Sequence, residues 1–307
     1  MENPPLPFVS VIIPVFNDAA RLKLCLAALE TQSYPQSHYE VIVVDNGSDD
    51  DQDIQGVVAE FKVAIATQEL LPGSYAARNK GISLAKGEII AFTDADCIPA
   101  TDWIEKGVQH LLKTSNCGLV AGEIKIFFKN PEQLTPVELF EKVTAFTQKE
   151  YLEKYKYGAT ANLFTFKTVI EHIGCFNATL KSSGDLEWGQ RVAASDYQLL
   201  YAADACVAHP ARYSFKQIYK RTIRIVGGSY DLQLNKNYSF LRQNKVLFKS
   251  LLEDLLPPLN FVIKVFGDLR LNGFGQKLRV SLVMLFIRYV SAWERIRLML
   301  GGVSIRE

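Results

Sequence analysis

The first 125 residues alternate between short apolar runs and amphipathic segments, and this alternation limits the folds open to the chain. Val9–Ile13 and Tyr39–Asp45 are β-branched runs that predict buried strands. Between them, apolar residues recur at helical spacing after Asn17, which we expect to cap the helix (Leu22, Cys25, Leu26 and Leu29). Such alternation predicts an α/β fold with a mostly parallel sheet covered by helices.

Further segments continue the pattern. We expect strands at 61–67, 88–93 and 119–127, and helices at 74–86 and 103–112, with Gly87 as the C-terminal cap of the first. Beyond them lie a helix-rich stretch at 136–155, strands at 161–166 and 198–203, and a helix at 184–194. Ligands of parallel sheets bind at the carboxyl ends of strands. Asp45 and Asp94 both end predicted strands, so we expect both in one site.

Composition places the chain among folded globular proteins, with 48% hydrophobic and 22% charged residues. The five cysteines are widely spaced and form no Cys-x-x-Cys pair, which argues against a disulfide framework and favours a reducing cytoplasm. Residues 1–5 carry no basic region followed by an apolar run, so no signal peptide is expected. The predicted location is cytoplasmic, or peripheral at the inner face of the membrane.

Charge is divided unevenly along the chain. Residues 211–307 hold 17 Lys/Arg and 6 Asp/Glu, a balance of +11, whereas residues 1–210 have a balance of −10. Within the tail, Lys277, Arg288 and Arg295 are spaced to form one basic stripe on an otherwise apolar helix. Two structures fit this pattern: a helix lying in a membrane interface, or a helix packed against the rest of the protein. The 14-residue stretch Val280–Trp293 contains Arg288 and is too short to span a membrane.

Asp94-Ala95-Asp96 directly follows an apolar strand and places two carboxylates at a rigid edge. A divalent metal held by few carboxylates can neutralise a departing diphosphate. On its own an Asp-x-Asp sequence is most often a solvated turn, so its chemical meaning depends on the segments around it.

Six segments in order along the chain carry a family resemblance: Val9–Asn17, Val43–Ser48, Ala77–Gly81, Phe92–Asp96, Asn162–Phe164 and Ser183–Arg191. Over about residues 8–212 the chain resembles the family-2 inverting glycosyltransferases of the GT-A fold, and the ordered set is far more specific than any one motif. The resemblance implies a GT-A catalytic domain at 1–212, followed by a helical, basic C-terminal region at 213–307 that associates with a membrane or packs on the domain.

The resemblance also implies roles for individual residues. A set of residues corresponds to the nucleotide-binding positions of the family: Pro14, Phe16, Asp45, Asn46, Arg78, Asp94 and Ala95. The family often has Asp-Asp where this chain has Asp45-Asn46, which bears on the identity of the base. Asp96 and His209 correspond to positions that hold a divalent metal, Mn²⁺ or Mg²⁺.

Asp185 matches the family position of the catalytic base, which removes the proton of the acceptor hydroxyl. The usual pattern is Glu-Asp, and Gly184 replaces the glutamate here. Residues expected near the acceptor are Asn162, Gly184, Glu187 and Trp188. The implied reaction is metal-assisted inverting transfer from a nucleotide-diphosphate sugar, with UDP the expected nucleotide, to a hydroxyl of a glycan or lipid-linked acceptor.

Other functions are weighed against this one. A nucleotidyltransferase acting on sugar phosphates would carry a Gly-rich loop with a basic residue near the N-terminus, and a dehydrogenase would carry Gly-x-Gly-x-x-Gly; both sequences are absent. A catalytically inactive, membrane-docked scaffold would not need Asp94, Asp96 and Asp185. The basic tail is interleaved with aliphatic residues, which favours a membrane surface over nucleic acid as its partner.

Overall fold

The structure is a computed structural model that describes residues 6–234 and 240–305, with side chains described for 6–234 and 245–305. Residues 1–5, on which the expected lack of a signal peptide rests, lie outside the described residues. The chain divides into two compact units. The sheet unit comprises Met1–Lys125, Phe146–Thr179 and Gly184–His209, and the helical unit comprises Ile126–Ala145, Leu180–Ser183 and Pro210–Glu307. Both units are discontinuous in sequence, and the division into domains at residue 212 stays a prediction.

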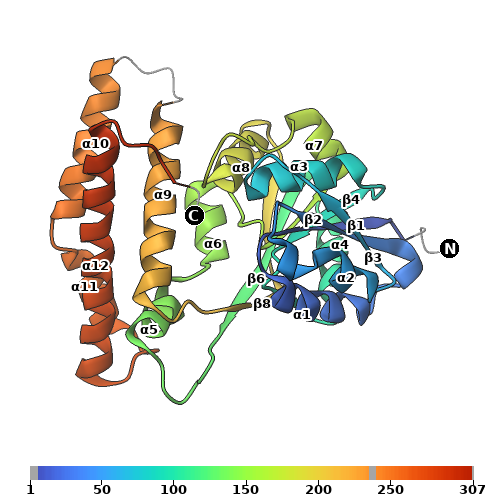
Figure 1. Cartoon of the computed structure of the whole chain (residues 1–307), viewed down its shortest axis with the longest axis horizontal. Coiled ribbons are helices and arrows are strands. Elements are labelled where there is room, and N and C mark those ends of the chain that lie inside the picture. The colour runs from blue at the N-terminus through green and yellow to red at the C-terminus, as the bar shows by residue number, and fades with distance from the viewer. Residues whose placement is uncertain (1–5, 235–239, 306–307) are drawn as a thin grey trace. The chain divides into compact units, whose positions relative to one another are not determined.

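Within the described part of the chain, the strands form one sheet in the order β3-β2-β1-β4-β7-β6-β8-β5. Their bounds are β1 Val9–Val15, β2 Tyr39–Asp45, β3 Ala64–Gln68, β4 Ile89–Thr93, β5 Ile98–Pro99, β6 Cys117–Phe127, β7 Asn162–Phe166 and β8 Gln198–Pro210 (Figure 1). The first four strands pair in parallel, whereas β7 is antiparallel to both β4 and β6. The predicted α/β class is confirmed, with a sheet that mixes the two directions.

The register of β1 explains why one edge of the sheet collects polar residues. Val15 of β1 is paired with Asp45 of β2, and Ile12 of β1 is paired with Phe92 of β4. All three strands run in the same direction, so the loops after β1, β2 and β4 open at the same edge. The predicted grouping of Asp45 with Asp94 follows from this register.

Helices of the sheet unit connect these strands: α1 Ala19–Glu30, α2 Ile54–Ala59, α3 Ser74–Leu84, α4 Trp103–Lys113, α6 Gln148–Glu150, α7 Lys167–Ile173 and α8 Gly184–Ala194. Short 3₁₀ helices lie at Gln36–His38 and Asp50–Gln52, and a π-helix, η3, at Tyr151–Tyr155. The predicted apolar face of α1 is confirmed, since Leu22, Cys25, Leu26 and Leu29 are all buried.

Two predicted caps are wrong. The residue before α1 is Asp18, not Asn17. Asn17 has a positive φ of 49° and joins the β1 loop to the β2 loop by hydrogen bonds with Ser48 and Asp49. Helix α3 ends at Leu84, so Gly87 does not cap it. A Cβ at Gly87 would lie 2.5 Å from the backbone nitrogen of Ser10, and glycine is therefore required for close approach of the chain to β1.

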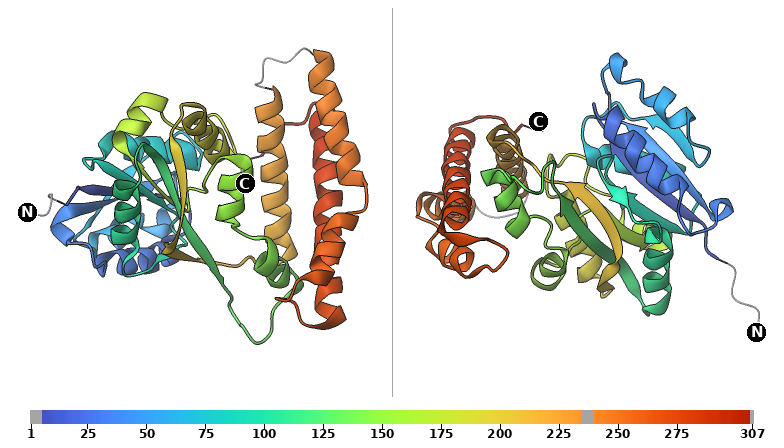
Figure 2. Two further views of the ribbon diagram at one scale, coloured as in Figure 1. Left: turned by 180° about the vertical axis from the view of Figure 1, so that it is seen from behind. Right: turned by 90° about the horizontal axis from the view of Figure 1, so that it is seen from below.

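The helical unit is built from α5 Pro136–Thr144, α9 Phe215–Leu234, α10 Phe240–Leu255, α11 Leu259–Gly267 and α12 Gly273–Met299. Helix α12 packs against both α9 and α10 (Figures 1 and 2). The core of the helical unit joins residues of α5, α9, α11 and α12, among them Phe140, Ile218, Val265, Val280 and Val283. Among the described residues, no helix combines the length and apolar character needed to cross a membrane.

The three cations of the basic stripe expected on α12 form hydrogen bonds within the helical unit. Arg295 Nε donates to Asp254 Oδ2 at 3.0 Å, and Arg288 Nη1 donates to the carbonyl of Glu253 at 2.5 Å. Lys277 Nζ donates to the carbonyl of Phe266 at 2.6 Å. Of the two structures left open from the sequence, packing against the protein accounts for these three cations, because α10 and α11 supply their partners. Contact of this region with a membrane stays a prediction.

Candidate active site

The loops after β1 and β2 form the first wall of the candidate site. Pro14 is half-buried in β1 opposite Val44, and Phe16, one residue beyond the strand, is 41% exposed. Asp45 ends β2 and accepts a hydrogen bond from the backbone of Ser48 at 3.0 Å, which closes a tight turn. An exposed ring and a carboxylate thus lie at the ends of adjacent strands.

Asn46 is engaged by the protein itself. Its Nδ2 donates to the carbonyls of Glu69 and Leu71, and its Oδ1 accepts from the backbone of Gly73 at 2.6 Å. The side chain thereby braces the loop between β3 and α3. We expected this amide to contact the nucleotide. In the structure, both of its N–H groups and one lone pair of its oxygen form hydrogen bonds with the loop between β3 and α3.

Arg78 and Asp94 form the centre of the site. Arg78 lies on α3 and is 4% exposed, and its Nη2 donates to Asp94 Oδ1 at 2.5 Å. Among the described side chains, Arg78 Nε is buried without a hydrogen-bond partner. A buried guanidinium N–H left unpaired costs free energy unless an acceptor reaches it, so this atom fits a site for an anionic ligand. Ala95 is buried in the core and has only its backbone to offer a ligand.

Asp96 and His209 meet at the neighbouring strand ends. His209 Nε2 lies 3.5 Å from Asp96 Oδ1, and Asp96 Oδ2 lies 3.5 Å from Arg21 Nη1 of α1. Burial raises the pKa of the Asp96 carboxyl, and His209 acts in the opposite direction. The His209 ring packs against Phe146 at 4.6 Å, whose φ of 47° is rare for a bulky residue. The imidazole is thereby held in a fixed orientation toward the carboxylate.

These side chains have the donors of a metal site. Among the described residues, ligand atoms of Asp96, Cys97 and His209 lie within 4.8 Å of one another. Burial raises the pKa of the Cys97 thiol well above its usual range, which disfavours the thiolate that a metal would need. Carboxylate and imidazole are therefore the ligands that this cluster can supply to a divalent metal.

Asp185 stands in the first turn of α8, linked to the other side chains through Tyr75. The Tyr75 hydroxyl donates to Asp185 Oδ1 at 3.3 Å, and the backbone of Leu186 donates to the same oxygen at 2.9 Å. The Tyr75 ring in turn lies 5.7 Å from the Arg78 guanidinium carbon. Burial raises the pKa of Asp185, and the Leu186 hydrogen bond, the Arg78 charge and the Tyr75 hydrogen bond oppose it.

Gly184 makes room for this arrangement. A Cβ at Gly184 would lie 2.7 Å from atoms of the Tyr75 ring. That ring is buried and stacks on Phe176 at 5.8 Å. Where the resembling family has a glutamate side chain, this chain has an aromatic ring that enters from α3. Gly184 thus leaves the space that the Tyr75 ring occupies. This role differs from the acceptor contact that we expected.

Two residues expected at the acceptor lie in the core. Asn162 is fully buried and all its side-chain hydrogen bonds are internal, with Trp103, Glu123 and Ala205. Trp188 is also fully buried, and its Nε1 donates to the carbonyl of Gly174. Neither offers surface to an acceptor, so the structure corrects both predictions: Asn162 ties β7 to β6 and β8, and Trp188 fills the space beneath α8.

Glu187 is partly exposed, and both its oxygens bind Arg191, at 2.8 and 3.1 Å. Arg191 also donates to the carbonyls of Ile173 and Cys175. This bidentate pair anchors α8 to the loop after α7. Of the four residues expected near the acceptor, Glu187 alone is partly exposed, whereas Asn162, Gly184 and Trp188 are buried.

Three residues of the site were missed by sequence reasoning. Tyr75 bonds Asp185, Phe146 holds His209, and Arg21 pairs with Asp96. Each comes from a segment remote in sequence from its partner, and none belongs to a motif. The one available signal was Gly184, because a position without a side chain leaves space that a neighbour such as Tyr75 can fill.

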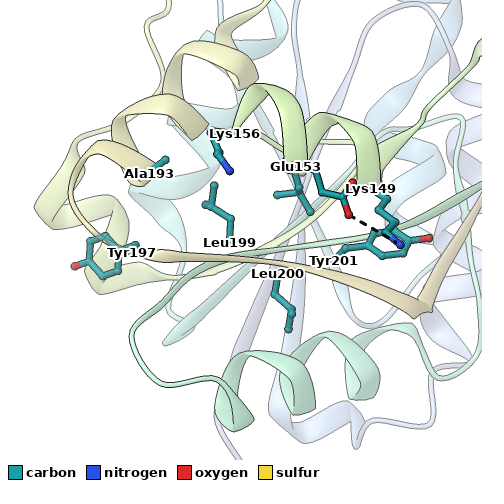
Figure 3. Close-up of a pocket in the computed structure, with 9 residues that line it drawn as sticks. Lys149, Glu153, Lys156, Ala193, Tyr197, Leu199, Leu200 and Tyr201 are labelled. Carbon is teal, nitrogen blue, oxygen red and sulfur yellow. Dashed lines mark ion pairs between the residues drawn. The ribbon is translucent and has the colours of Figure 1, made fainter.

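A separate cavity of about 530 Å³ lies in the sheet unit and contains none of the predicted site residues. Figure 3 shows the side chains from η3 and β8 that face it, with Glu153 paired to Lys149. Its lining is Lys149, Leu152, Glu153, Lys156, Ala193, Tyr197, Leu199, Leu200 and Tyr201. It lacks the cluster of aspartates that marks the candidate site.

The chain is similar in sequence to known proteins. The sequence profile of the family described as "Glycosyl transferase family 2" matches residues 10–183. The chain is 37% identical over 273 residues to glycosyltransferase AglE of Haloferax volcanii, and the alignment covers 87% of each protein. It is 26% identical over 228 residues to the pre-mycofactocin glycosyltransferase of Mycobacterium tuberculosis, covering 72% of this chain and 46% of that protein.

A solved structure extends the likeness to the fold. The mannosyltransferase PcManGT from Pyrobaculum calidifontis, in complex with GDP-Man and Mn²⁺, aligns with a TM-score of 0.62 over 96% of this chain and 88% of its own, at 17% identity. The family profile covers more than half of the chain, and a named glycosyltransferase aligns with nearly all of it. The chain therefore belongs to glycosyl transferase family 2, and it is a glycosyltransferase of the GT-A fold.

Proposed function

We propose that this glycosyltransferase moves a sugar, with inversion, from a nucleotide-diphosphate sugar to a hydroxyl of a glycan or lipid-linked acceptor, assisted by a divalent metal. The observation that carries the proposal is a continuous series of contacts from Asp94 through Arg78 and Tyr75 to Asp185. It links the groups suited to a diphosphate with the group suited to a proton acceptor at one edge of the sheet.

At the donor end, Phe16 and Asp45 border the nucleoside and Arg78 faces the diphosphate. The unpaired Arg78 Nε supports this assignment, because a phosphate oxygen would satisfy it. Asn46 contributes by holding the loop at residues 69–73 in place. UDP remains the nucleotide we propose, and the GDP-Man bound by the structural neighbour makes GDP sugars the first alternative to test.

Asp96 and His209 fit a divalent metal, since their carboxylate and imidazole atoms converge in one cluster. When bound, the metal would neutralise negative charge on the departing diphosphate. The Mn²⁺ held by the structural neighbour supports the choice of Mn²⁺ over Mg²⁺, as does a nitrogen donor in the set. Phe146 keeps the His209 ring turned toward Asp96.

In the proposed reaction the acceptor oxygen attacks the anomeric carbon from the side opposite the diphosphate. The bond from that carbon to the diphosphate oxygen breaks, and the nucleoside diphosphate leaves with the bonding electrons. Asp185 takes the acceptor proton. Its raised pKa supports this role, because a more basic carboxylate accepts a proton more readily near neutral pH.

The decisive test compares Asp185→Asn with the wild type. Activity is measured as nucleoside diphosphate released from UDP or GDP sugars with Mn²⁺ and membrane-lipid or glycan acceptors. We expect a loss of about 10²–10⁴-fold, the usual contribution of a general base. Donor binding, measured as a rise in melting temperature, should persist. Asp51→Asn, at an exposed aspartate, is the matched control.

The outcomes separate the parts of the proposal. Full activity of Asp185→Asn would show that another group accepts the proton. In Asp96→Ala, donor-induced stabilisation should lose its dependence on Mn²⁺ while Asp185→Asn keeps it. A wild-type protein that binds donors but never turns them over with any acceptor would support the inactive-scaffold alternative instead.

A further inference from the structure

The segment from α11 through most of α12 presents apolar side chains outward from the helical unit. We call residues 259–293 the apolar hairpin: α11, the turn at 268–272 and most of α12. Leu269 at the turn is 95% exposed, and Ile263 and Phe274 on either side are 70% and 68% exposed. Leaving side chains of this size in water is costly, so a surface of this kind in a folded protein usually has a partner.

The exposed residues follow the helical repeat. On α12 they are Phe274, Leu278, Leu282, Tyr289 and Trp293. At 3.6 residues per turn these five positions fall within an arc of about 100°. The opposite side of the same helix is buried, with Val280 and Val283 fully enclosed in the core of the helical unit. The helix thus has two apolar faces, and packing accounts for one of them.

Helix α11 continues this exposed face. Leu259, Ile263 and Phe266 are exposed and recur at intervals of four and three residues, on one side of the helix. The rings of Phe266 and Phe274 meet edge to face at 5.7 Å, which joins the exposed stripe of α11 to that of α12. The two helices and their turn therefore form one apolar surface.

The turn that carries Leu269 is held against α5 by hydrogen bonds. Arg270 binds Asp268 at 2.6 Å and donates to the carbonyls of Lys142 and Val143 at the end of α5. Leu271 is buried in the core of the helical unit. Leu269 is thus held outward by a fixed backbone, so its exposure does not come from a loose loop.

Charge around this surface has one sign. Residues 257–293 contain five Lys/Arg and a single acidic residue, Asp268, which Arg270 neutralises. Lys264 on α11 and Arg279 on α12 are both exposed, and Arg279 lies at the edge of the apolar arc of α12. Apolar side chains flanked by cations, with Trp and Tyr at one end, are the combination that binds the interface of an anionic bilayer.

We propose that the apolar hairpin docks the protein on the surface of an anionic membrane, with Ile263, Leu269 and Phe274 entering the acyl boundary and Lys264 and Arg279 contacting headgroups. A second copy of the chain fits less well, because a two-fold contact would set these cations against each other, and residues 257–293 hold no exposed acid to pair them. The proposal goes beyond the transfer reaction and does not depend on it. It also differs from the basic stripe expected on α12, whose cations bind α10 and α11.

The test is co-sedimentation of the full chain with vesicles of phosphatidylcholine alone or mixed in equal parts with phosphatidylglycerol. Wild type should bind the mixed vesicles and bind the neutral ones weakly. Ile263→Gln/Leu269→Gln should weaken binding to mixed vesicles by at least about tenfold, since two inserted aliphatic chains are lost. Lys264→Gln/Arg279→Gln should weaken it roughly fivefold per cation, with no effect on neutral vesicles.

Leu24→Gln/Leu112→Gln is the matched control, because both leucines are 56% exposed and belong to the sheet unit. It should bind vesicles as the wild type does, and melting curves of all variants should show that each folds. Equal vesicle binding by the hairpin variants and the control overturns the proposal. A wild-type dimer that ignores vesicles and dissociates in Ile263→Gln/Leu269→Gln also overturns it, and assigns the surface to a second copy. Neither readout requires a donor or an acceptor, so failure here leaves the transferase proposal intact.

Discussion

Tyr75→Phe removes one hydroxyl from the candidate site and leaves the ring that fills the space beside Gly184. In the wild type that hydroxyl donates to Asp185 Oδ1 at 3.3 Å, which favours the carboxylate and lowers the pKa of Asp185 against the effect of burial. Losing the hydrogen bond therefore raises the pKa of Asp185 further. A hydrogen bond to a charged group contributes about 1.5–3 kcal/mol, and this long one belongs at the lower end.

The consequence depends on pH in a defined direction. A proton acceptor works only when ionised, so activity on the acid side is proportional to the ionised fraction of Asp185. A loss of about 1.5 kcal/mol lowers kcat/KM there roughly tenfold. At alkaline pH Asp185 is ionised in both proteins, and kcat/KM should be little changed.

The assay is the pH profile of kcat/KM for nucleoside diphosphate release by Tyr75→Phe. Tyr155→Phe, at a tyrosine that is 52% exposed at the end of η3, is the control and should match the wild type. A Tyr75→Phe profile that coincides with the wild type, or one lowered equally at every pH, would refute the reasoning that Tyr75 tunes Asp185.

Two further substitutions test other parts of the structure. Arg78→Lys keeps the positive charge but not the planar fork, so we expect KM for the donor to rise roughly tenfold with a smaller change in kcat; an unchanged KM would place the diphosphate elsewhere. Gly122→Ala would put a Cβ 2.2 Å from the carbonyl oxygen of Ala205 and 2.4 Å from Asn162 Nδ2, and should cost about 3 kcal/mol of unfolding free energy or more, measured by urea denaturation. Gly267→Ala, where a Cβ meets nothing within 4 Å, should be close to neutral, and equal effects of the two would contradict the packing argument.

The strand ends were predictable because their causes are local. Tyr39–Asp45 was predicted with the bounds that the structure has, since a β-branched run between turn residues has few other conformations. The end of β4 was also correct, and parallel pairing then brings Asp45 and Asp94 to the same edge. The apolar face of α1 was predicted from helical spacing for the same reason.

The corrected residues share a different feature: their environment is made by segments far away in sequence. Trp188 has the composition of a sugar-stacking residue, yet it is buried beneath α8 against Phe176. Asn46 has free hydrogen-bonding groups in sequence, yet the loop at 69–73 occupies them. The burial and the hydrogen-bond partners of these residues depend on which distant segments pack against them. The spacing of residues along the sequence does not predict that.

The basic tail shows the division most clearly. Sequence by itself determined that residues 211–307 are strongly cationic and that the last helix is apolar on more than one side. Tertiary structure decided which cations are available: Asp254 pairs with Arg288 and Arg295, whereas Lys264 and Arg279 stay exposed. The physical reason is that periodicity along a helix is local, whereas packing decides which face is covered: it buries one apolar stripe of α12 and leaves the other exposed.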